Sequence, residues 1–146
     1  MKIRNITTKI VLGITLFLFS AISAHAAGFG VSPTDIYNEY LAPGMSYERE
    51  FTLSRSGSFE ELDISIEPDL GDITSWFTFS PGNTFKFEEG ERTKKFKVIV
   101  NVPEDADYTE YDGAVRVKAV PSSQEIKGVS ITQGVRLDAG LIVTEV

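Results

Sequence analysis

Five carboxylate side chains crowd one short segment of the sequence, and they are the first residues whose types could do chemistry. Carboxylate oxygens at such density are the hard ligands that Ca²⁺ prefers. The spacing does not match an EF-hand loop, because counting Asp105 as its first position places Glu110 where that loop requires glycine. We therefore predict a solvent-exposed acidic loop over residues 104–112, with calcium binding as the alternative. Its carboxylates belong to Glu104, Asp105, Asp107, Glu110 and Asp112.

Pairs of carboxylates could also support glycoside hydrolysis, in which they flank the scissile bond. Asp63 and Glu67 alternate with apolar neighbours, as outward-facing strand residues do, and no pattern marks any carboxylate as desolvated. We therefore expect no catalytic residue and no enzyme activity.

Aromatic side chains are the next candidates, because exposed rings can stack on sugars or dock against proteins. Tyr37 and Tyr40 lie beside Asn38 and Glu39 in a segment without clear strand parity, so we expect both rings to be exposed. They form the candidate interaction surface. Trp76 is instead expected to fill the core, together with Phe79, Phe85 and Phe87.

The only cluster of positive charge covers residues 92–97. Lys95 and Lys97 alternate with Phe96 and Val98, which places the two lysines on a solvent face. We expect these lysines to protect an edge strand against pairing with a neighbouring chain. A site for an anionic polymer is the alternative.

Residues 1–26 differ in composition from the rest of the chain. They hold three of the 14 basic residues and none of the 21 acidic residues. A basic start, an apolar run from Ile10 to Ile22 and the small-residue site at Ala24 to Ala26 are typical of a secretory signal peptide. The apolar run is shorter than the roughly 20 residues that span a bilayer. We therefore expect cleavage after Ala26 and no retained membrane span.

Removal of this leader would leave residues 27–146 with 11 basic and 21 acidic side chains, a net charge of −10. This remainder contains neither cysteine nor histidine. Zinc sites built from those residues, Ser-His or Cys-His catalysis and disulfide bridges are thereby excluded. The negative charge opposes binding to nucleic acid or anionic lipid. We expect an exported chain, in the periplasm, at the cell surface or outside the cell, with no metal, cofactor or nucleic-acid partner.

Hydrophobic residues repeat with a period of two along most of residues 27–146, which indicates half-buried β-strands. Leu62, Ile64 and Ile66 alternate with polar residues, as do Phe96 and Val98. Turn signals rich in Pro and Gly separate these runs, and no segment has a capped helical pattern. The predicted fold is all-β, a single antiparallel sandwich of seven to eight strands of the immunoglobulin (Ig) or fibronectin type.

The longest alternating run covers residues 129–143. At about 3.3 Å per residue, one straight strand of this length would far exceed the usual size. We expect Gly134 or Gly140 to mark a bulge or a corner where the chain changes sheet, or the run to lead toward a downstream domain. A related hypothesis is that this C-terminal strand pairs with another chain, including self-association at a strand edge.

Tyr111 stands just before a late alternating strand. This position is typical of a tyrosine corner, in which the hydroxyl returns to the backbone of the preceding loop. Tyr108 is the alternative occupant of that corner.

Segments along nearly all of residues 27–146 resemble Ig/fibronectin-like domains of exported bacterial surface proteins, including those of candidate phyla. The resemblance lies in a Ser-Pro start, a Pro-Gly turn before the second strand, a Trp followed by Ser-Pro, and a Val-Pro…Tyr-x-Gly block. These features occur in VSPTDIYNEYLAPGMSYEREFTLSRSG, ITSWFTFSPG, FKFEEGERTKKFKVIVNVPEDADYTEYDGAVRV and GVSITQGVRLDAGLIV. Related patterns occur in the N-terminal domains of pilus chaperones. Thr109 and Glu110 precede Tyr111 where the family usually has glycine.

The resemblance implies a structural, spacer or protein-interaction domain in adhesion at the cell surface. A carbohydrate- or cell-wall-binding module that uses loop aromatics is the alternative function. The expected partner is accordingly an unknown protein or a cell-wall polymer.

Overall fold

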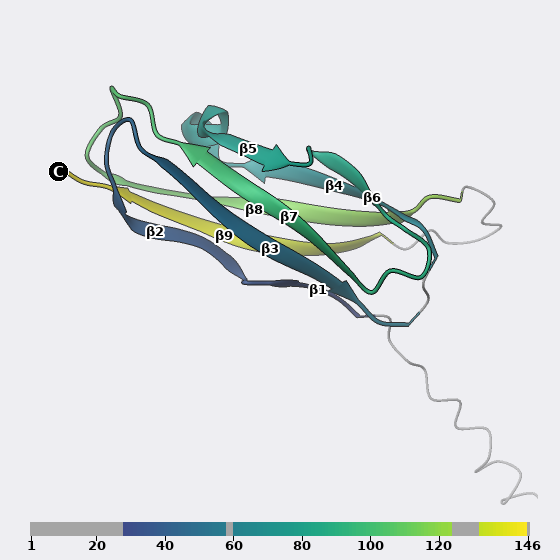
Figure 1. Cartoon of the computed structure of the whole chain (residues 1–146). Coiled ribbons are helices and arrows are strands. Elements are labelled where there is room, and N and C mark those ends of the chain that lie inside the picture. Colours follow the sequence, from purple (N-terminus) through teal and green to yellow (C-terminus); the bar gives the residue numbers. More distant parts are fainter. Residues whose placement is uncertain (1–27, 58–59, 124–131, 146) are drawn as a thin grey trace, which may run out of the picture.

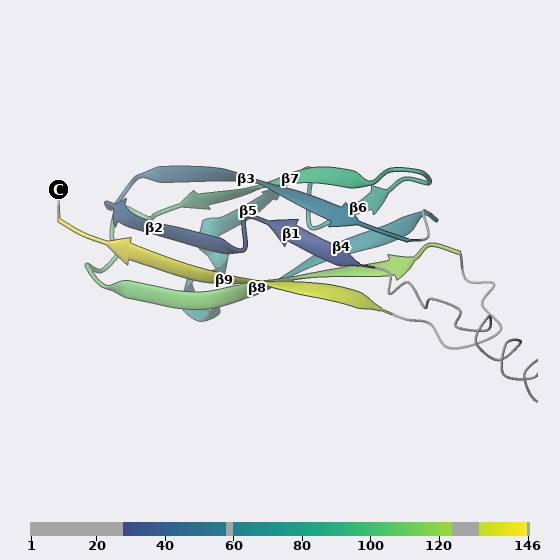
Figure 2. The same ribbon diagram turned by 90° about the horizontal axis from the view of Figure 1, so that it is seen from below.

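The computed structural model describes residues 28–57, 60–123 and 132–145, which form two packed β-sheets (Figures 1 and 2). The expected leader, residues 1–26, lies outside the described residues. One sheet has the strand order β1-β3-β7-β5 and the other has the order β2-β9-β8-β4-β6. The prediction of an all-β sandwich is confirmed. The described residues form nine strands where seven to eight were expected, and the pairing is antiparallel except between β2 and β9.

Within the described residues, nine strands and one 3₁₀ helix follow one another along the chain. None of the helical structure in the described ranges is long and apolar enough to cross a membrane. The bounds are β1 Phe29–Ser32, β2 Asp35–Leu41, β3 Ser46–Arg55, β4 Leu62–Asp69, η1 Gly71–Trp76, β5 Phe77–Ser80, β6 Thr84–Phe87, β7 Thr93–Asn101, β8 Glu110–Pro121 and β9 Gln133–Val143.

The chain changes sheet near its start, between β1 and β2. β1 pairs antiparallel with β3, whereas β2 pairs parallel with β9 in the other sheet. The cis bond between Ser32 and Pro33 lies at this change. Proline cannot donate a ladder hydrogen bond, so it suits a position between two paired segments.

The expectation of a sheet change at Gly134 or Gly140 was wrong. β9 stays in one sheet from Gln133 to Val143, and its register with β8 is unbroken from Gln133 to Ile142. The irregularity lies opposite, on β2, where the register with β9 shifts between Asn38 and Leu41. Residues 129–131 of the predicted run lie outside the described part of the chain.

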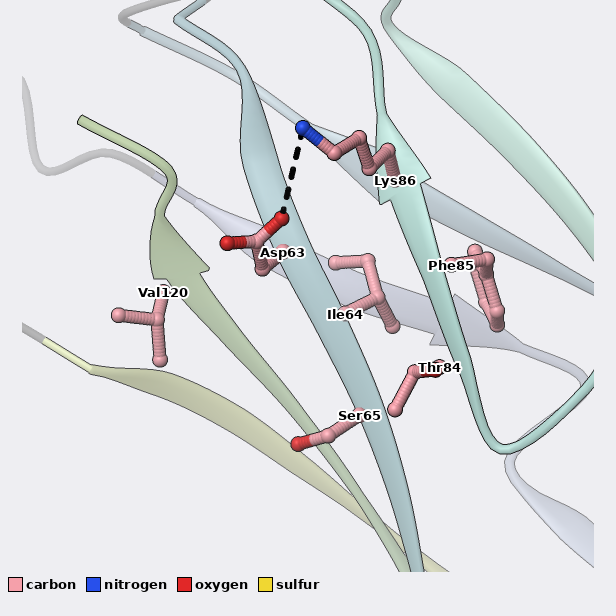
Figure 3. Close-up of a pocket in the computed structure, with 7 residues that line it drawn as sticks. All are labelled: Asp63, Ile64, Ser65, Thr84, Phe85, Lys86 and Val120. Carbon is pink, nitrogen blue, oxygen red and sulfur yellow. Dashed lines mark ion pairs between the residues drawn. The ribbon is translucent and has the colours of Figure 1, made fainter.

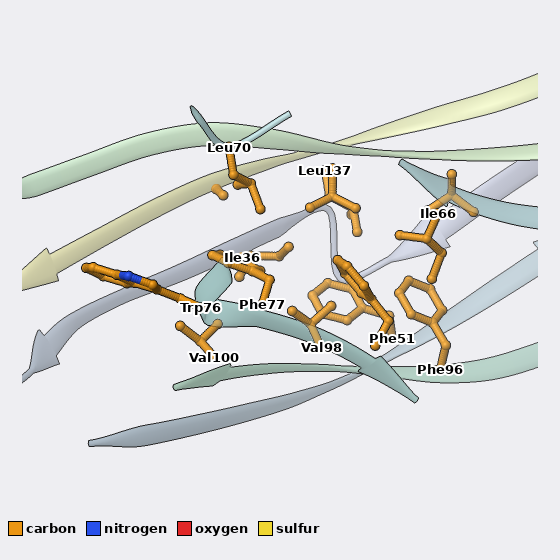
Figure 4. Packing of buried hydrophobic residues seen from close by; sticks show 14 of the residues in the cluster. Ile36, Phe51, Ile66, Leu70, Trp76, Phe77, Phe96, Val98, Val100 and Leu137 are labelled. Atoms are coloured by element: carbon orange, nitrogen blue, oxygen red, sulfur yellow. The ribbon is translucent and has the colours of Figure 1, made fainter. Parts of the chain in front are cut away.

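Apolar side chains from both sheets meet in the interior. Figure 4 shows Phe51, Phe96 and Val98 on one side and Ile66 and Leu137 on the other. The rings of Phe51 and Phe96 stack with centroids 5.4 Å apart. Burying each such side chain stabilises the fold by about 1.5–3 kcal/mol, so the period-two pattern supplies most of the driving force.

The outer faces carry opposite charges on neighbouring strands. Lys95 and Lys97 of β7 extend to Glu50 and Glu48 of β3, with N–O distances of 2.8 and 2.7 Å. The expectation that these lysines protect an edge strand was wrong for Lys97, where β7 lies between β3 and β5, whereas Lys95 lies beyond the described pairing with β5. Alternation correctly placed the lysines on the solvent face, but it carries no information about which strands are neighbours.

Candidate interaction surface

Exposed aromatic side chains gather at one end of the sandwich. The exposed fractions are 47% for Tyr37, 78% for Tyr40 and 63% for Tyr108, and Met45 beside them is 44% exposed. They lie on β2, on the β2–β3 turn and on the β7–β8 connection, which meet at the end where the C-terminus is marked (Figure 1). We call these four residues the tyrosine end. Val120, the remaining large hydrophobic exposed in the described ranges, lies near the far end of β8.

A bulge on β2 explains why both Tyr37 and Tyr40 face solvent. In a regular strand Tyr40 would share the inward side with Ile36, which is fully buried. The register shift places one extra residue of β2 between Asn38 and Leu41. The side chain of Leu41 therefore points into the core. The Asn38 side chain stabilises the bulge, because its Oδ1 accepts the N–H of Tyr40 at 2.8 Å. The segment whose sequence shows no clear alternation is therefore a strand, and its alternation of inward and outward side chains shifts by one residue at the bulge.

Gly140 of β9 makes room for the Tyr37 ring. The two residues are directly opposite in the β2–β9 register. A Cβ atom at Gly140 would lie 3.1 Å from Tyr37 Cδ2, a closer approach than most side chains accept. The sequence drew attention to this glycine, but as a corner rather than as the neighbour of an exposed ring.

Glu39 sets the electrostatics of the two rings. Its negative charge is the largest of the influences that raise the pKa of Tyr37, whose hydroxyl also donates to Glu39 Oε2 at 3.2 Å. The pKa of Tyr40 is raised chiefly by hydrogen bonding to Glu39 and then by the charge of that carboxylate. Both phenols therefore stay protonated and can donate hydrogen bonds at neutral pH.

Tyr111 anchors the loop that carries Tyr108. Its hydroxyl donates to the carbonyl of Asp107 at 3.1 Å, which is the geometry expected of a tyrosine corner. Its ring meets Trp76 edge to face, with centroids 4.8 Å apart and an interplanar angle of 65°. Trp76 itself is only 8% exposed. Tyr108 takes no part in the corner and projects into solvent.

Backbone hydrogen bonds fasten together the segments that carry the exposed rings. Thr144 donates to the carbonyl of Leu41 at 2.8 Å, and Val143 donates to that of Thr109 at 3.0 Å. Gly44, in the β2–β3 turn, donates to the carbonyl of Val102 at 3.0 Å. The tyrosine end is consequently built on a connected backbone rather than on independent loops.

This end of the molecule is strongly acidic. Residues 37–47, 101–113 and 139–145 contain seven carboxylates and neither lysine nor arginine. None of the ion pairs within the described residues involves these carboxylates. In the same residues no group of three or more acidic side chains converges as a metal site would require. The carboxylates are those of Glu39, Glu104, Asp105, Asp107, Glu110, Asp112 and Glu145.

The edge formed by β2 is closed by side chains of β3. Arg49 Nη1 donates to the carbonyl of Asp35 at 3.3 Å, and Tyr47 donates its hydroxyl to the carbonyl of Tyr37 at 3.4 Å. Carbonyls engaged in this way are not available to an added strand.

The C-terminal strand has little free edge. Between Asp138 and Val143, β9 lies between β8 and β2, which contradicts the hypothesis that this part pairs with another chain. Only the stretch from Gln133 to Leu137 has no described ladder pairing on the β2 side, and β1 comes close to β9.

A second candidate is a shallow depression on the outer face of β4, β6 and β8 (Figure 3). Lys86 and Asp63 lie across it with an N–O distance of 3.9 Å, and Val120 forms its apolar side. A hydrogen bond from Lys86 to Glu61 raises the pKa of Lys86, so the amine stays protonated.

No protein-family model and no curated protein matches the sequence. Solved structures are similar in fold. The ASH/PapD-like domain 7 of human CEP192 aligns with a TM-score of 0.55 and 16% identity, covering 80% of this chain and 87% of that one. A chain from the complex of the Salmonella enterica SafA pilin with the SafB chaperone gives a TM-score of 0.58 and 15% identity.

That alignment covers 83% of this chain and 57% of the other, so the present chain spans little more than half of it. A family 123 glycoside hydrolase from Clostridium perfringens also aligns, with a TM-score of 0.56 and 11% identity, over 83% of this chain but only 28% of the hydrolase. Similarity at these identities concerns the fold alone. The chain is an Ig-like β-sandwich whose structural neighbours include PapD-like domains.

Proposed function

We propose that the chain is a non-catalytic, exported Ig-like module that binds a protein partner through the tyrosine end. The observation that carries the proposal is the gathering of Tyr37, Tyr40, Met45 and Tyr108 at one end of the sandwich. Tyrosine combines a large apolar ring with a hydrogen-bonding hydroxyl, which is why it is enriched in protein interfaces. The fastened backbone supports the same conclusion, because a preorganised surface loses little entropy on binding.

Export and a role as a structural or spacer domain at the cell surface belong to the same proposal. Export is supported by the signal-peptide pattern of residues 1–26. The PapD-like fold of the structural neighbours is compatible with a protein-binding role, and one of these neighbours comes from a complex of a chaperone with a pilin.

Photocrosslinking in cells tests the proposal. The full chain is expressed with p-benzoylphenylalanine in place of Tyr40, and the matched control carries it in place of Val120, which is exposed at the other end of the molecule. We expect a discrete protein adduct from position 40 and none from position 120. Equal labelling at both positions, or no protein adduct at position 40, would contradict the proposal.

Binding to a cell-wall polysaccharide is the second candidate function, favoured by the exposed rings of Tyr37 and Tyr40. Stacking on sugars would be lost in a Tyr37→Ala/Tyr40→Ala variant. Depletion on immobilised peptidoglycan or chitin distinguishes the candidates. A glycan-binding module is removed from solution and the variant is not, whereas a protein-binding module is retained by neither matrix.

A further inference from the structure

We propose that the partner of the tyrosine end is a cationic polypeptide segment, one that presents clustered lysine or arginine side chains. This inference rests on the proposed function and names the chemistry of its partner. Three features support it: the distribution of charge over the molecule, the shape of the outer face beside Tyr37, and the occupants that the same surface disfavours.

Charge is balanced over the sheets but not at the tyrosine end. Eight lysine and arginine side chains of the described residues form ion pairs with carboxylates on or beside the strands. Arg55, a further cation, is buried among backbone carbonyls. Within the described ranges, the seven carboxylates that lie around the tyrosine end form no ion pair. Elsewhere in the described ranges Glu60, Asp72, Glu88 and Glu89 also form no ion pair. The larger group of unpaired carboxylates therefore lies beside the exposed rings, where a cationic partner would be attracted.

Because Gly140 has no side chain, the Tyr37 ring lies close over it and beside the carboxylate of Asp112. Tyr37, Gly140 and Asp112 stand in one row across β2, β9 and β8. From the position of a Cβ at Gly140, the nearest atoms are Tyr37 Cδ2 at 3.1 Å on one side and Asp112 Oδ1 at 3.9 Å on another. A lysine or arginine side chain that lies on the exposed outer face of this row would meet both the Tyr37 ring and the negative charge of Asp112. Cation–π attraction and Coulomb attraction then act on the same group.

An open depression adjoins this row on the outer face of the same sheet. It has a volume of about 440 Å³, and Ala114 lies among the carboxylates of Asp69, Asp112 and Asp138 that line it. Arg136 also lines the depression and is paired with Asp138 at 2.8 Å, and Asp69 is paired with Arg116 at 3.3 Å. Asp112 is therefore the carboxylate of this depression that remains available to a further cationic side chain of the same segment.

The same features disfavour other occupants. A second copy of this chain would bring seven more carboxylates to the surface, and like charges in an interface oppose association. A neutral glycan could stack on the rings and donate hydroxyl hydrogen bonds to the carboxylates, but it has no positive charge to balance theirs. The cationic segment is the occupant for which both the rings and the charges are favourable.

Fluorescence anisotropy with defined peptides tests the inference. The probes are labelled peptides of alternating lysine and serine, glutamine and serine, or glutamate and serine, all of one length. The full chain is compared with Glu110→Gln/Asp112→Asn at the tyrosine end. The matched control is Glu60→Gln/Glu89→Gln, which removes the same charge beside a depression at the other end of the molecule.

We expect the lysine peptide to bind, with affinity falling as salt is added. The Glu110→Gln/Asp112→Asn change should weaken it roughly fivefold and the control change by less than about twofold. Tyr40→Ala should weaken binding and Tyr40→Phe should preserve it, because the ring and not the hydroxyl attracts the cation. Equal losses in the two charge variants would overturn the inference, since the attraction would then reflect net charge alone. Stronger binding of the glutamine or glutamate peptide would also overturn it.

Crosslinking at position 40 separates this inference from the proposed function. An adduct with a protein segment that lacks clustered lysine and arginine would overturn the cationic partner and leave the protein-binding function standing. An adduct with a basic segment, lost in Glu110→Gln/Asp112→Asn, would support both.

Discussion

Arg55 is the only charged side chain that the fold buries among the described residues, at 7% exposure. Its guanidinium donates to the carbonyls of Glu91 and Glu88, each at 2.7 Å, and to that of Glu60. It also stacks over the Phe87 ring at 4.5 Å. One side chain thereby joins the β3–β4 connection to the β6–β7 connection. The sequence contained a signal for this role, because Arg55 shares the inward parity of Phe51 and Leu53.

Removing the guanidinium should therefore destabilise the whole domain. We expect Arg55→Met to lower the free energy of unfolding by about 2–4 kcal/mol, because buried carbonyls lose their donors. Arg55→Lys should recover only part of the loss, since one ammonium cannot reach three separated carbonyls. Urea unfolding measures the effect, with Lys95→Met as the exposed control. Equal stability of the Arg55 and Lys95 variants would show that the carbonyl cluster contributes nothing.

Tyr37 and Tyr40 were predicted from the sequence to be exposed, because polar neighbours surround them. The role of Glu39 could not be predicted, since it depends on a bulge that brings one carboxylate to both phenols. The ring-to-glycine contact with Gly140 likewise depends on a parallel pairing between residues about a hundred positions apart.

Replacement of Glu39 should lower the pKa of both phenols. Because the amide of glutamine carries no negative charge, Glu39→Gln should bring the pKa of Tyr37 and Tyr40 back toward 10.0. A raised pKa favours the neutral phenol in the fold, so its contribution to stability is present below the ordinary value and is lost as pH rises through the raised one. Ultraviolet titration of the phenols measures the change, with Glu89→Gln as the control. An unchanged titration curve would contradict the role of Glu39.

The strands themselves were easier to predict than the order in which they pair within the sheets. The alternation of Leu62, Ile64 and Ile66 gave the correct inward face of β4, because burial acts on each residue separately. The position of β7 inside its sheet was missed, because neighbours are chosen by long-range packing that a single strand does not encode. The change of sheet at Pro33 was missed for the same reason.

Mutation of Tyr47 and Arg49 tests whether their side chains protect the edge of β2. Arg49→Ser/Tyr47→Phe removes the donors to the carbonyls of Asp35 and Tyr37 and should expose a strand edge. We expect the variant to self-associate more strongly than the unaltered chain in sedimentation velocity over a range of concentrations. Identical sedimentation of the two proteins would mean that the edge is protected by other means.

At the scale of the whole molecule, ion pairs between neighbouring strands link stability to pH. Hydrogen bonds from Lys95 and Lys86, aided by their charges, lower the pKa of Glu50 and Glu61 below the ordinary 4.5. A lowered pKa means that the fold prefers the carboxylate. Its contribution to stability is therefore present above the ordinary value and is lost as pH falls through the lowered one.

The Lys86→Met/Lys95→Met variant should respond less to acid than the unaltered chain. Thermal unfolding followed from neutral pH to below the ordinary carboxyl pKa should show a smaller drop in Tm for the variant. The effect is modest, because all four groups are exposed to solvent and screened by it. A parallel decline of the two proteins would mean that these pairs do not couple folding to protonation.

The parallel pairing of β2 with β9 has a mechanical consequence. The start of β1 and the end of β9 lie at opposite ends of the sandwich (Figure 1). Between them the chain runs through β1, which pairs antiparallel with β3, and then through β2, which runs parallel to β9. A pull applied between these ends would slide β1 along β3 and β2 along β9, and would load the hydrogen bonds of each pair together instead of opening them one after another. The domain would thus resist stretching along its long axis.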